Sequence, residues 1–189
     1  MADLVASSDP ELRMSREAFH NWAEAQPQGR FERVDGVVVA MAPERASHND
    51  TKMLAWLALR QAVEAAGLPC HVYGDGMTVA VDDSDFEPDV VLHCGETLPA
   101  DAIVVAEPLV VVEVLSPSTR GVDLTRKLAA YFRLPSVQHY LVLWADRPQV
   151  VHHRRREDGQ GLATRILTEG EIRLDPPGIS MTLAELYRG

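Results

Sequence analysis

Several features are scarce in this sequence of 189 residues. No apolar run approaches the ~18 residues needed to cross a bilayer. The first residues, MADLVASSDPELRMS, have neither the basic nor the apolar region of a secretion signal. Only two cysteines occur, Cys70 and Cys94, which is too few for a disulfide scaffold and is typical of a reducing compartment. We therefore expect a cytoplasmic protein with no membrane partner, in which both cysteines are small core residues.

Positive charge is also in short supply. The chain has 28 acidic and 18 basic residues and a formal net charge of −10, so its overall field does not favour binding to a polyanion. Enzymes that bind divalent metals must nevertheless cluster carboxylates, and local groups of arginines can still contact phosphates. Only Lys52 and Lys127 are lysines. Since lysine, unlike arginine, can lose its proton near neutral pH, these two positions are candidates for a specific role.

The hydrophobic patterns predict a flexible N-terminal tail over residues 1–14 and a single domain over residues 15–189. Asp35-Gly36 lies between two β-rich runs and predicts a hairpin. We expect an α/β (α+β) fold with a mixed central β-sheet flanked by helices, preceded by this hairpin and a long helix. The expected helices are 16–25 after Ser15, 48–66 after Ser47 and 122–134, and the further strands are 70–73, 77–81, 89–94, 109–116, 139–144 and 149–154, with a last short strand and helical turn within 173–189.

A glutamate interrupts the most apolar of these strands. The run VVVEVL is typical of a strand buried on both faces, yet Glu113 lies in its middle. Burying an unpaired carboxylate costs several kcal/mol, so Glu113 must be protonated, paired with a cation, or bound to a metal. A second carboxylate, Asp89, begins the strand at 89–94. If the two strands are neighbours, Asp89, Glu113 and the carbonyl of Val114 supply the oxygen ligands that Mg²⁺ or Mn²⁺ prefers.

The helix expected after Glu113 can complete such a site. Asp123, Lys127 and Tyr131 are spaced four residues apart and therefore share one helix face. The ammonium of Lys127 could orient or deprotonate a metal-bound water and offset charge on a phosphoryl-transfer transition state. The simpler alternatives are a structural ion pair between Glu113 and Lys127, a solvated lysine, and a tyrosine that only packs.

Together these residues resemble a known family. The resemblance rests on Glu32 in FERVDG, His48 in ASHND, Pro88-Asp89, Glu113 in VVEVLSPST, and the D-x3-K-x3-Y spacing of Asp123, Lys127 and Tyr131. With these motifs the chain, from Ser15 to Leu186, resembles the Uma family of restriction endonuclease-like proteins in the PD-(D/E)XK nuclease superfamily. The resemblance implies a restriction-endonuclease-like fold and an Mg²⁺-dependent endonuclease that cuts DNA to leave a 3′-hydroxyl and a 5′-phosphate.

The resemblance also implies roles for individual residues. Asp89 and Glu113 would bind the metal together with the Val114 carbonyl, Lys127 would act at the attacking water, and Glu32 would assist. The superfamily places its lysine two residues after the glutamate, where this chain has Leu115, and Lys127 is the substitute that the Uma pattern also shows. The chain departs further from the family at Ser136, His139 and Leu141. The candidate contacts to phosphate or substrate are His48, Arg120 and Tyr131.

Other functions fit the same residues. A non-catalytic member of the fold would use its carboxylates and Lys127 as a structural ion pair and act as an interaction or nucleic-acid-binding protein, as the acidic net charge favours. An enzyme acting on another phosphate ester would share the site chemistry. In these alternatives Glu32 is an ordinary solvent-facing strand residue and His48 only caps a helix. If both strands of DNA are cut with one site per chain, a twofold homodimer is favoured.

Overall fold

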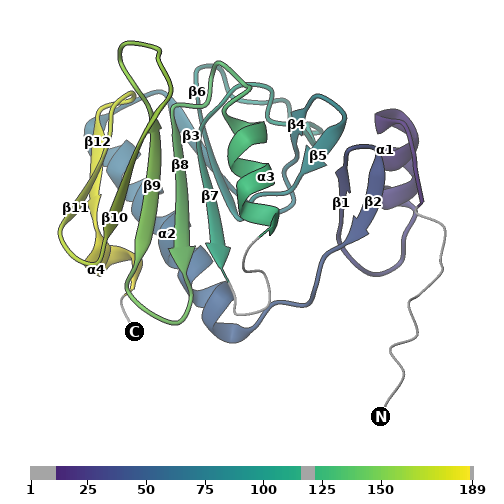
Figure 1. Ribbon diagram of the computed structural model, residues 1–189, viewed down its shortest axis with the longest axis horizontal. Helices are drawn as coiled ribbons and strands as arrows, with labels where there is room; N and C mark the ends of the chain where they lie inside the picture. The colour runs from purple at the N-terminus through teal and green to yellow at the C-terminus, as the bar shows by residue number, and fades with distance from the viewer. Residues whose placement is uncertain (1–11, 116–121, 188–189) are drawn as a thin grey trace.

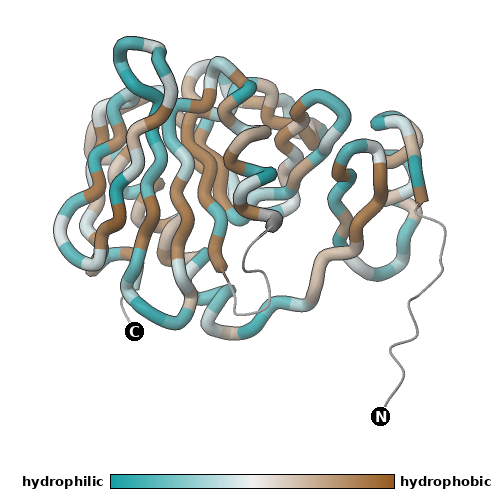
Figure 2. The backbone as a smooth tube through the Cα atoms, viewed as in Figure 1, coloured by the Kyte–Doolittle hydropathy of each residue, from teal (hydrophilic) through white to brown (hydrophobic). Residues whose placement is uncertain are grey.

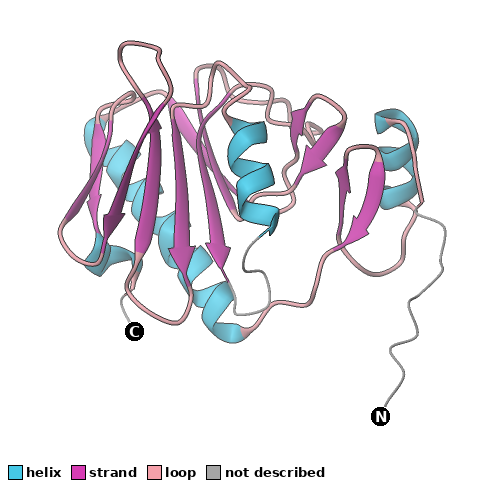
Figure 3. Ribbon diagram, in the orientation of Figure 1, coloured by secondary structure: helices cyan, strands magenta, loops and turns pink. Residues whose placement is uncertain are grey.

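The computed structural model describes residues 12–115 and 122–187. In this part of the chain, helices lie on both faces of a central sheet (Figures 1 and 3). None of the described helices is long and apolar enough to cross a membrane. The helices are α1 (Arg16–Glu24), α2 (Ala46–Ala66), α3 (Val122–Tyr131) and α4 (Leu183–Leu186), and the strands are β1 (Phe31–Val34), β2 (Val37–Ala40), β3 (Cys70–Gly74), β4 (Val79–Val81), β5 (Ser84–Phe86), β6 (Val90–Cys94), β7 (Pro108–Leu115), β8 (His139–Trp144), β9 (Val150–Arg155), β10 (Leu162–Leu167), β11 (Glu171–Leu174) and β12 (Ile179–Thr182).

The central sheet has six strands in the order β10-β9-β8-β7-β6-β3. Strands β7 and β8 are parallel, whereas every other neighbouring pair in this sheet is antiparallel. A parallel pair needs a crossover connection, and α3 lies in the connection between β7 and β8. The predicted mixed sheet flanked by helices is confirmed.

Strand β7 is buried on both faces, as its sequence predicted. Val112 and Val114 pack into the core cluster under α2, whereas Val111 and Leu115 pack into the cluster under α3. Figure 2 shows the resulting brown centre of the sheet, where hydrophobic strands run side by side. Because side chains alternate along a strand, Glu113 faces the same side as Val111 and Leu115, which is the α3 side. The carboxylate is therefore directed toward the helix that carries Lys127.

The predicted hairpin is confirmed. Asp35 and Gly36 connect β1 to β2 with φ values of 49° and 81°, the left-handed values that a two-residue hairpin turn of this type requires. β1 also pairs with β5, and the buried Arg33 donates to Asp85 of that strand at 2.6 Å. This small sheet, ordered β2-β1-β5-β4, holds the hairpin beside the central sheet. At the end of the predicted tail, the N–H of Met14 donates to Gly36 O at 2.9 Å.

The two ends of α2 were predicted with different success. The stop of α2 at Gly67 is confirmed, since Gly67 caps the helix with a φ of 62°. The start was predicted wrongly, because α2 begins at Ala46 and its N-cap is Arg45, which makes no side-chain capping bond. Ser47 lies inside the first turn, where its carbonyl accepts from the Thr51 hydroxyl at 2.9 Å.

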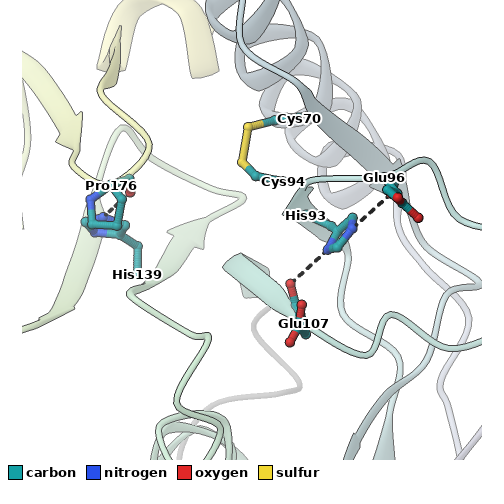
Figure 4. Close-up of a disulfide and its surroundings, with 7 residues drawn as sticks. All are labelled: Cys70, His93, Cys94, Glu96, Glu107, His139 and Pro176. Carbon is teal, nitrogen blue, oxygen red and sulfur yellow. Dashed lines mark hydrogen bonds between the residues drawn. A yellow bond between two sulfur atoms is a disulfide. The ribbon is translucent and has the colours of Figure 1, made fainter.

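The prediction of two unlinked core cysteines is wrong. Cys70 and Cys94 lie directly opposite each other in the β3–β6 pair and form a disulfide (Figure 4). The two positions are 24 residues apart in the chain, so only the strand register brings them together. Disulfides are typical of oxidising compartments, and the cysteine pattern therefore no longer supports the cytoplasmic expectation.

Candidate active site

Strand register brings the two predicted metal-binding carboxylates together. Val90 of β6 pairs with Val112 of β7 in an antiparallel ladder, so Asp89 lies opposite Glu113 at the next position. Asp89 is buried and its Oδ2 accepts the N–H of Val114 at 2.7 Å. The side chain of Glu113 is 12% exposed. The expectation that these two side chains converge is therefore met.

Helix α3 places Lys127 at the same point. Its buried Nζ lies 2.8 Å from Glu32 Oε1 and 3.0 Å from Glu113 Oε1. One turn later on the same helix face, the Tyr131 hydroxyl donates to Glu113 Oε1 at 2.9 Å. The ammonium also lies 5.6 Å from the centre of the Phe86 ring. The D-x3-K-x3-Y spacing thus places both the lysine and the tyrosine on Glu113.

Glu32 reaches the site from the hairpin. It is buried rather than solvent-facing, and its Oε1 accepts the N–H of Glu87 at 2.9 Å as well as the Lys127 ammonium. The pairing of β1 with β5 fixes this position, since Glu87 directly follows β5. Lys127 therefore joins a carboxylate of the small sheet to a carboxylate of the central sheet.

His48, on the first turns of α2, lies on the other side of Asp89. Its Nε2–H donates to the Val114 carbonyl at 2.9 Å and lies 3.5 Å from Asp89 Oδ2. Its Nδ1 lies 3.5 Å from Glu44 Oε2 and is buried without a hydrogen-bond partner in the described ranges. Ligand atoms of Glu44, His48 and Asp89 all lie within 4.8 Å of one another, close enough to hold a metal ion. The sequence analysis did not identify Glu44 as a site residue, although its position four residues before His48 could have indicated it.

Burial and neighbouring charges shift two of these groups. The pKa of Glu113 is raised to about 8, chiefly by burial, which Lys127 opposes and to which Asp89 and Glu32 add. Burial alone would lower the pKa of His48, but Asp89 and Glu44 outweigh this effect and raise it. The site therefore favours a protonated glutamate and a charged histidine when no other cation is bound.

These side chains border one cavity of about 350 Å³. Asp89 Oδ1 and Glu113 Oε2 have no hydrogen-bond partner among the residues that the structure describes, and neither does Glu32 Oε2. Carboxylate and carbonyl oxygens are the donors that Mg²⁺ and Mn²⁺ prefer. The residues present therefore fit a divalent cation on chemical grounds. The polar lining comprises Glu32, Glu44, Arg45, His48, Glu87, Asp89, Glu113, Arg126 and Lys127.

A model of the family described as "Putative restriction endonuclease" matches residues 16–184. The chain belongs to this family, Uma2. Two uncharacterized proteins of Synechocystis sp. are similar to this Uma2 chain. The first is 26% identical over 184 residues, which cover 96% of this chain and 95% of the relative. The second is 27% identical over 150 residues, which cover 77% of this chain and 84% of the relative. The crystal structure of a putative nuclease belonging to DUF820 from Anabaena variabilis superposes with a TM-score of 0.73, at 13% identity, over 92% of this chain and 97% of that one. That likeness confirms the predicted fold.

The second lysine of this Uma2 protein is also part of the site's surroundings. Lys52 of α2 is buried, and its Nζ lies 2.5 Å from Glu44 and 2.8 Å from Asp75. Burial alone would lower the pKa of Lys52, but these two carboxylates raise it, so the ammonium stays charged. Arg30 binds the same two carboxylates and Glu87. The scarcity of lysine thus marked two buried positions, one at the Glu113 site and one that orients Glu44.

The remaining candidates for contact with substrate or phosphate differ in their position relative to the cavity. Tyr131 is fully buried and is not among the residues that line the cavity, so its hydroxyl lies behind Glu113. His48 lines the cavity, as a substrate contact must. Arg120 and the side chain of Asp123 lie outside what the structure describes.

Proposed function

We propose that this Uma2 protein is a metal-dependent endonuclease that hydrolyses DNA phosphodiester bonds. The observation that carries the proposal is the meeting of Asp89, Glu113 and Glu32 with Lys127 at one cavity, with carboxylate oxygens left unpartnered among the described residues. Oxygen ligands for a hard cation beside a lysine ammonium are the groups that phosphodiester hydrolysis needs. Membership in a family described as restriction endonucleases supports the same reaction.

Each residue has a role in this account. Asp89, Glu113 and the Val114 carbonyl would hold Mg²⁺ or Mn²⁺, which would supply Lewis-acid stabilisation and make a bound water more acidic. Glu113 must lose its proton to serve as a ligand, whereas the Val114 carbonyl can accept from His48 with one lone pair and offer the other to a cation. Lys127, held by Glu32, would orient the attacking water through its ammonium, and Glu32 Oε2, which has no partner among the described residues, would take up the proton that the water loses.

The reaction that follows is an in-line displacement. The water oxygen bonds to phosphorus while the bond from phosphorus to the 3′ oxygen breaks, and the departing oxygen takes up a proton from solvent, which leaves a 3′-hydroxyl and a 5′-phosphate. The charge that develops on the phosphoryl oxygens lies beside the Lys127 ammonium. Tyr131, which lies behind Glu113, acts as a positioning residue and not as a contact to phosphate.

The group of Glu44, His48 and Asp89 gives a second position for a cation beside the first. Asp89 belongs to both sets of ligand atoms. Because an imidazole is a softer ligand than a carboxylate, this position suits Mn²⁺ better than Mg²⁺. A stronger response to Mn²⁺ than to Mg²⁺ would be the sign that His48 takes part.

The alternative function is a catalytically inactive nuclease fold that acts as an interaction or nucleic-acid-binding module. The ion pairs of Lys127 with Glu32 and Glu113 favour it, because they satisfy the lysine without any metal. Metal titration distinguishes the two functions, since an ion that binds only the folded state raises the melting temperature. A melting temperature unmoved by Mg²⁺ and Mn²⁺ supports the inactive module.

The catalytic role of Lys127 is tested by nicking of supercoiled plasmid DNA in Mg²⁺ and in Mn²⁺. We expect Lys127→Ala to lose nicking while its melting temperature still rises with metal. Thr125→Ala, an exposed change on the same helix, is the matched control and should cut as the wild type does. Equal nicking by Lys127→Ala and wild type would remove the lysine from the mechanism.

We further propose that the protein acts as a homodimer, because one site per chain must act twice to cut both strands of a duplex. The mass in solution, measured by light scattering with and without a DNA duplex, tests this assembly. A monomer that makes double-strand breaks at first order in protein would contradict it.

A further inference from the structure

The cavity is strongly acidic at its base. Six carboxylates line it or bind its cations, whereas only three permanently charged cations lie among them. Each of these cations is already bound to at least two of the carboxylates. With His48 also charged, a divalent cation no more than neutralises this excess of carboxylates, so these groups offer a phosphodiester no net positive charge. The carboxylates are Glu32, Glu44, Asp75, Glu87, Asp89 and Glu113, and the cations are Arg30, Lys52 and Lys127.

Two further arginines line the same cavity but are not bound to its carboxylates. Arg45 is exposed at the N-cap of α2, and its side chain makes no hydrogen bond or ion pair with the residues that the structure describes. Arg126 of α3 is paired only with Asp35, at 3.9 Å, and the two side chains are 53% and 66% exposed. An ion pair this exposed contributes little to stability, so a phosphate can replace Asp35.

These two arginines reach the cavity from different elements. Arg45 follows the connection from β2 to α2, whereas Arg126 lies one position before Lys127 on α3 (Figure 1). The carboxylates of Asp89 and Glu113 line the same cavity. A nucleic-acid strand placed over the carboxylates can therefore meet one arginine from each element.

Several arginines outside the cavity are bound to internal partners. Arg155, within the basic run at 154–156, donates to three backbone carbonyls, and Arg156 binds Asp158 at 2.7 Å. Arg33 is buried on Asp85. In the described part of the chain, neither the Arg45 side chain nor the Arg126 side chain is held by internal partners of this kind.

We propose that Arg45 and Arg126 bind the phosphates that flank the scissile bond, forming a two-arginine clamp over the acidic cavity. The inference rests on the proposed nuclease function and names the residues that hold its substrate. A guanidinium can donate two parallel hydrogen bonds to one phosphate, and such contacts fix the position of a strand without reading its sequence. Both arginines are positioning residues, so they govern DNA binding and not the bond-breaking step.

The clamp is tested with a fluorescent DNA duplex in Mg²⁺ or Mn²⁺, by measuring initial cleavage rates across DNA concentrations and salt concentrations. We expect Arg45→Gln and Arg126→Gln each to raise KM about tenfold, the loss of one charged hydrogen-bonding group, with kcat nearly unchanged. Each change should lower the slope of log KM against log salt concentration by about 1. Arg45→Lys and Arg126→Lys should restore that slope because they keep the charge.

Arg173→Gln is the matched control. Arg173 lies on β11 with a side chain that is 81% exposed, and it is not part of the cavity lining. Its substitution removes the same charge and should leave KM and the salt slope unchanged. Melting temperatures of all variants check that they fold.

Three results would overturn the clamp: a fall in kcat with KM unchanged, an unaltered salt slope, or an equal effect of Arg173→Gln. A wild-type protein that cuts DNA and is insensitive to both arginine substitutions removes the clamp alone. A wild-type protein that neither binds nor cuts DNA with either metal removes the proposed function and the clamp together.

Discussion

A buried histidine pair makes the stability of this protein sensitive to acid. His139 of β8 and His152 of β9 are 1% and 4% exposed, and His139 Nδ1 lies 2.9 Å from His152 Nε2. His139 Nε2–H donates to the Pro176 carbonyl at 2.9 Å (Figure 4). Nδ1 of His139 must then accept from Nε2–H of His152, which requires the His139 ring to be neutral.

The pKa values follow from this environment. Burial lowers the pKa of His139 to about 4, with Arg154 adding to the effect and the Pro176 carbonyl opposing it. Burial, followed by His139, Arg154 and Arg165, lowers the pKa of His152 to about 3. The unfolded chain binds these protons near the ordinary histidine pKa of about 6.5.

The sign and the magnitude follow by linkage. The unfolded state takes up protons first as the pH falls, so stability is fully present above pH ~6.5 and is lost below it. Between pH 8 and pH 5 each histidine costs about 2 kcal/mol, and the pair costs about 4 kcal/mol. A loss of this size is a large part of the 5–15 kcal/mol that stabilises a typical domain.

The assay is urea unfolding of wild type and His152→Gln at pH 8, 7, 6 and 5. The glutamine amide can still donate to His139 but does not titrate. We therefore expect the variant to lose about 2 kcal/mol less than the wild type between pH 8 and pH 5. The same pH dependence in both proteins would refute the reasoning, because it would mean that His152 is not held neutral.

Three further predictions concern stability and site geometry. The disulfide joins two positions 24 residues apart, and its reduction should lower the free energy of unfolding by about 3 kcal/mol. Urea unfolding with and without a reductant measures this effect, and no change would contradict a structural role for the disulfide. Arg33→Met should cost about 3 kcal/mol or more in the same assay, because it leaves the buried Asp85 with its other partners only; a cost below about 1 kcal/mol would argue against the buried pair. Tyr131→Phe should remove one hydrogen bond from Glu113 and lower the free energy of unfolding by about 1 kcal/mol. The variant should also nick plasmid DNA more slowly without a rise in KM, whereas a raised KM would indicate direct contact with DNA.

The core of the candidate site could be predicted because its signals are local. The negative charge of the carboxylate within the VVVEVL strand needed a partner. The helical spacing from Lys127 to Tyr131 indicated which face of the following helix could provide that partner. Asp35-Gly36 specified the hairpin that carries Glu32. Each of these inferences depends on residues within one element or one turn.

Features that depend on pairing between distant segments could not be predicted. The disulfide follows from the β3–β6 register, which nothing in the sequence around Cys70 or Cys94 specifies. Glu44 becomes part of the site only when α2 packs beside Asp89. The strands missed by the sequence analysis are short or polar, and they are β5 (SDF), β10 (LATRIL) and β11 (EIRL).

The departures from the family at two positions concern packing. Leu141 is buried in the core cluster under α2, and His139 belongs to the histidine pair with His152. Neither residue lines the candidate cavity. These differences therefore leave the arrangement of Asp89 and Glu113 intact.

The central claim is that Asp89 holds a catalytic cation, and the most direct test is the initial rate of plasmid nicking by wild type and Asp89→Asn in Mg²⁺. The asparagine keeps the size of the side chain and an oxygen that can accept the Val114 N–H, but it removes the charge. The account predicts a rate at least about 100-fold lower for the variant, with a melting temperature that no longer rises with metal. Nicking by a pure Asp89→Asn preparation at the wild-type rate would contradict the account.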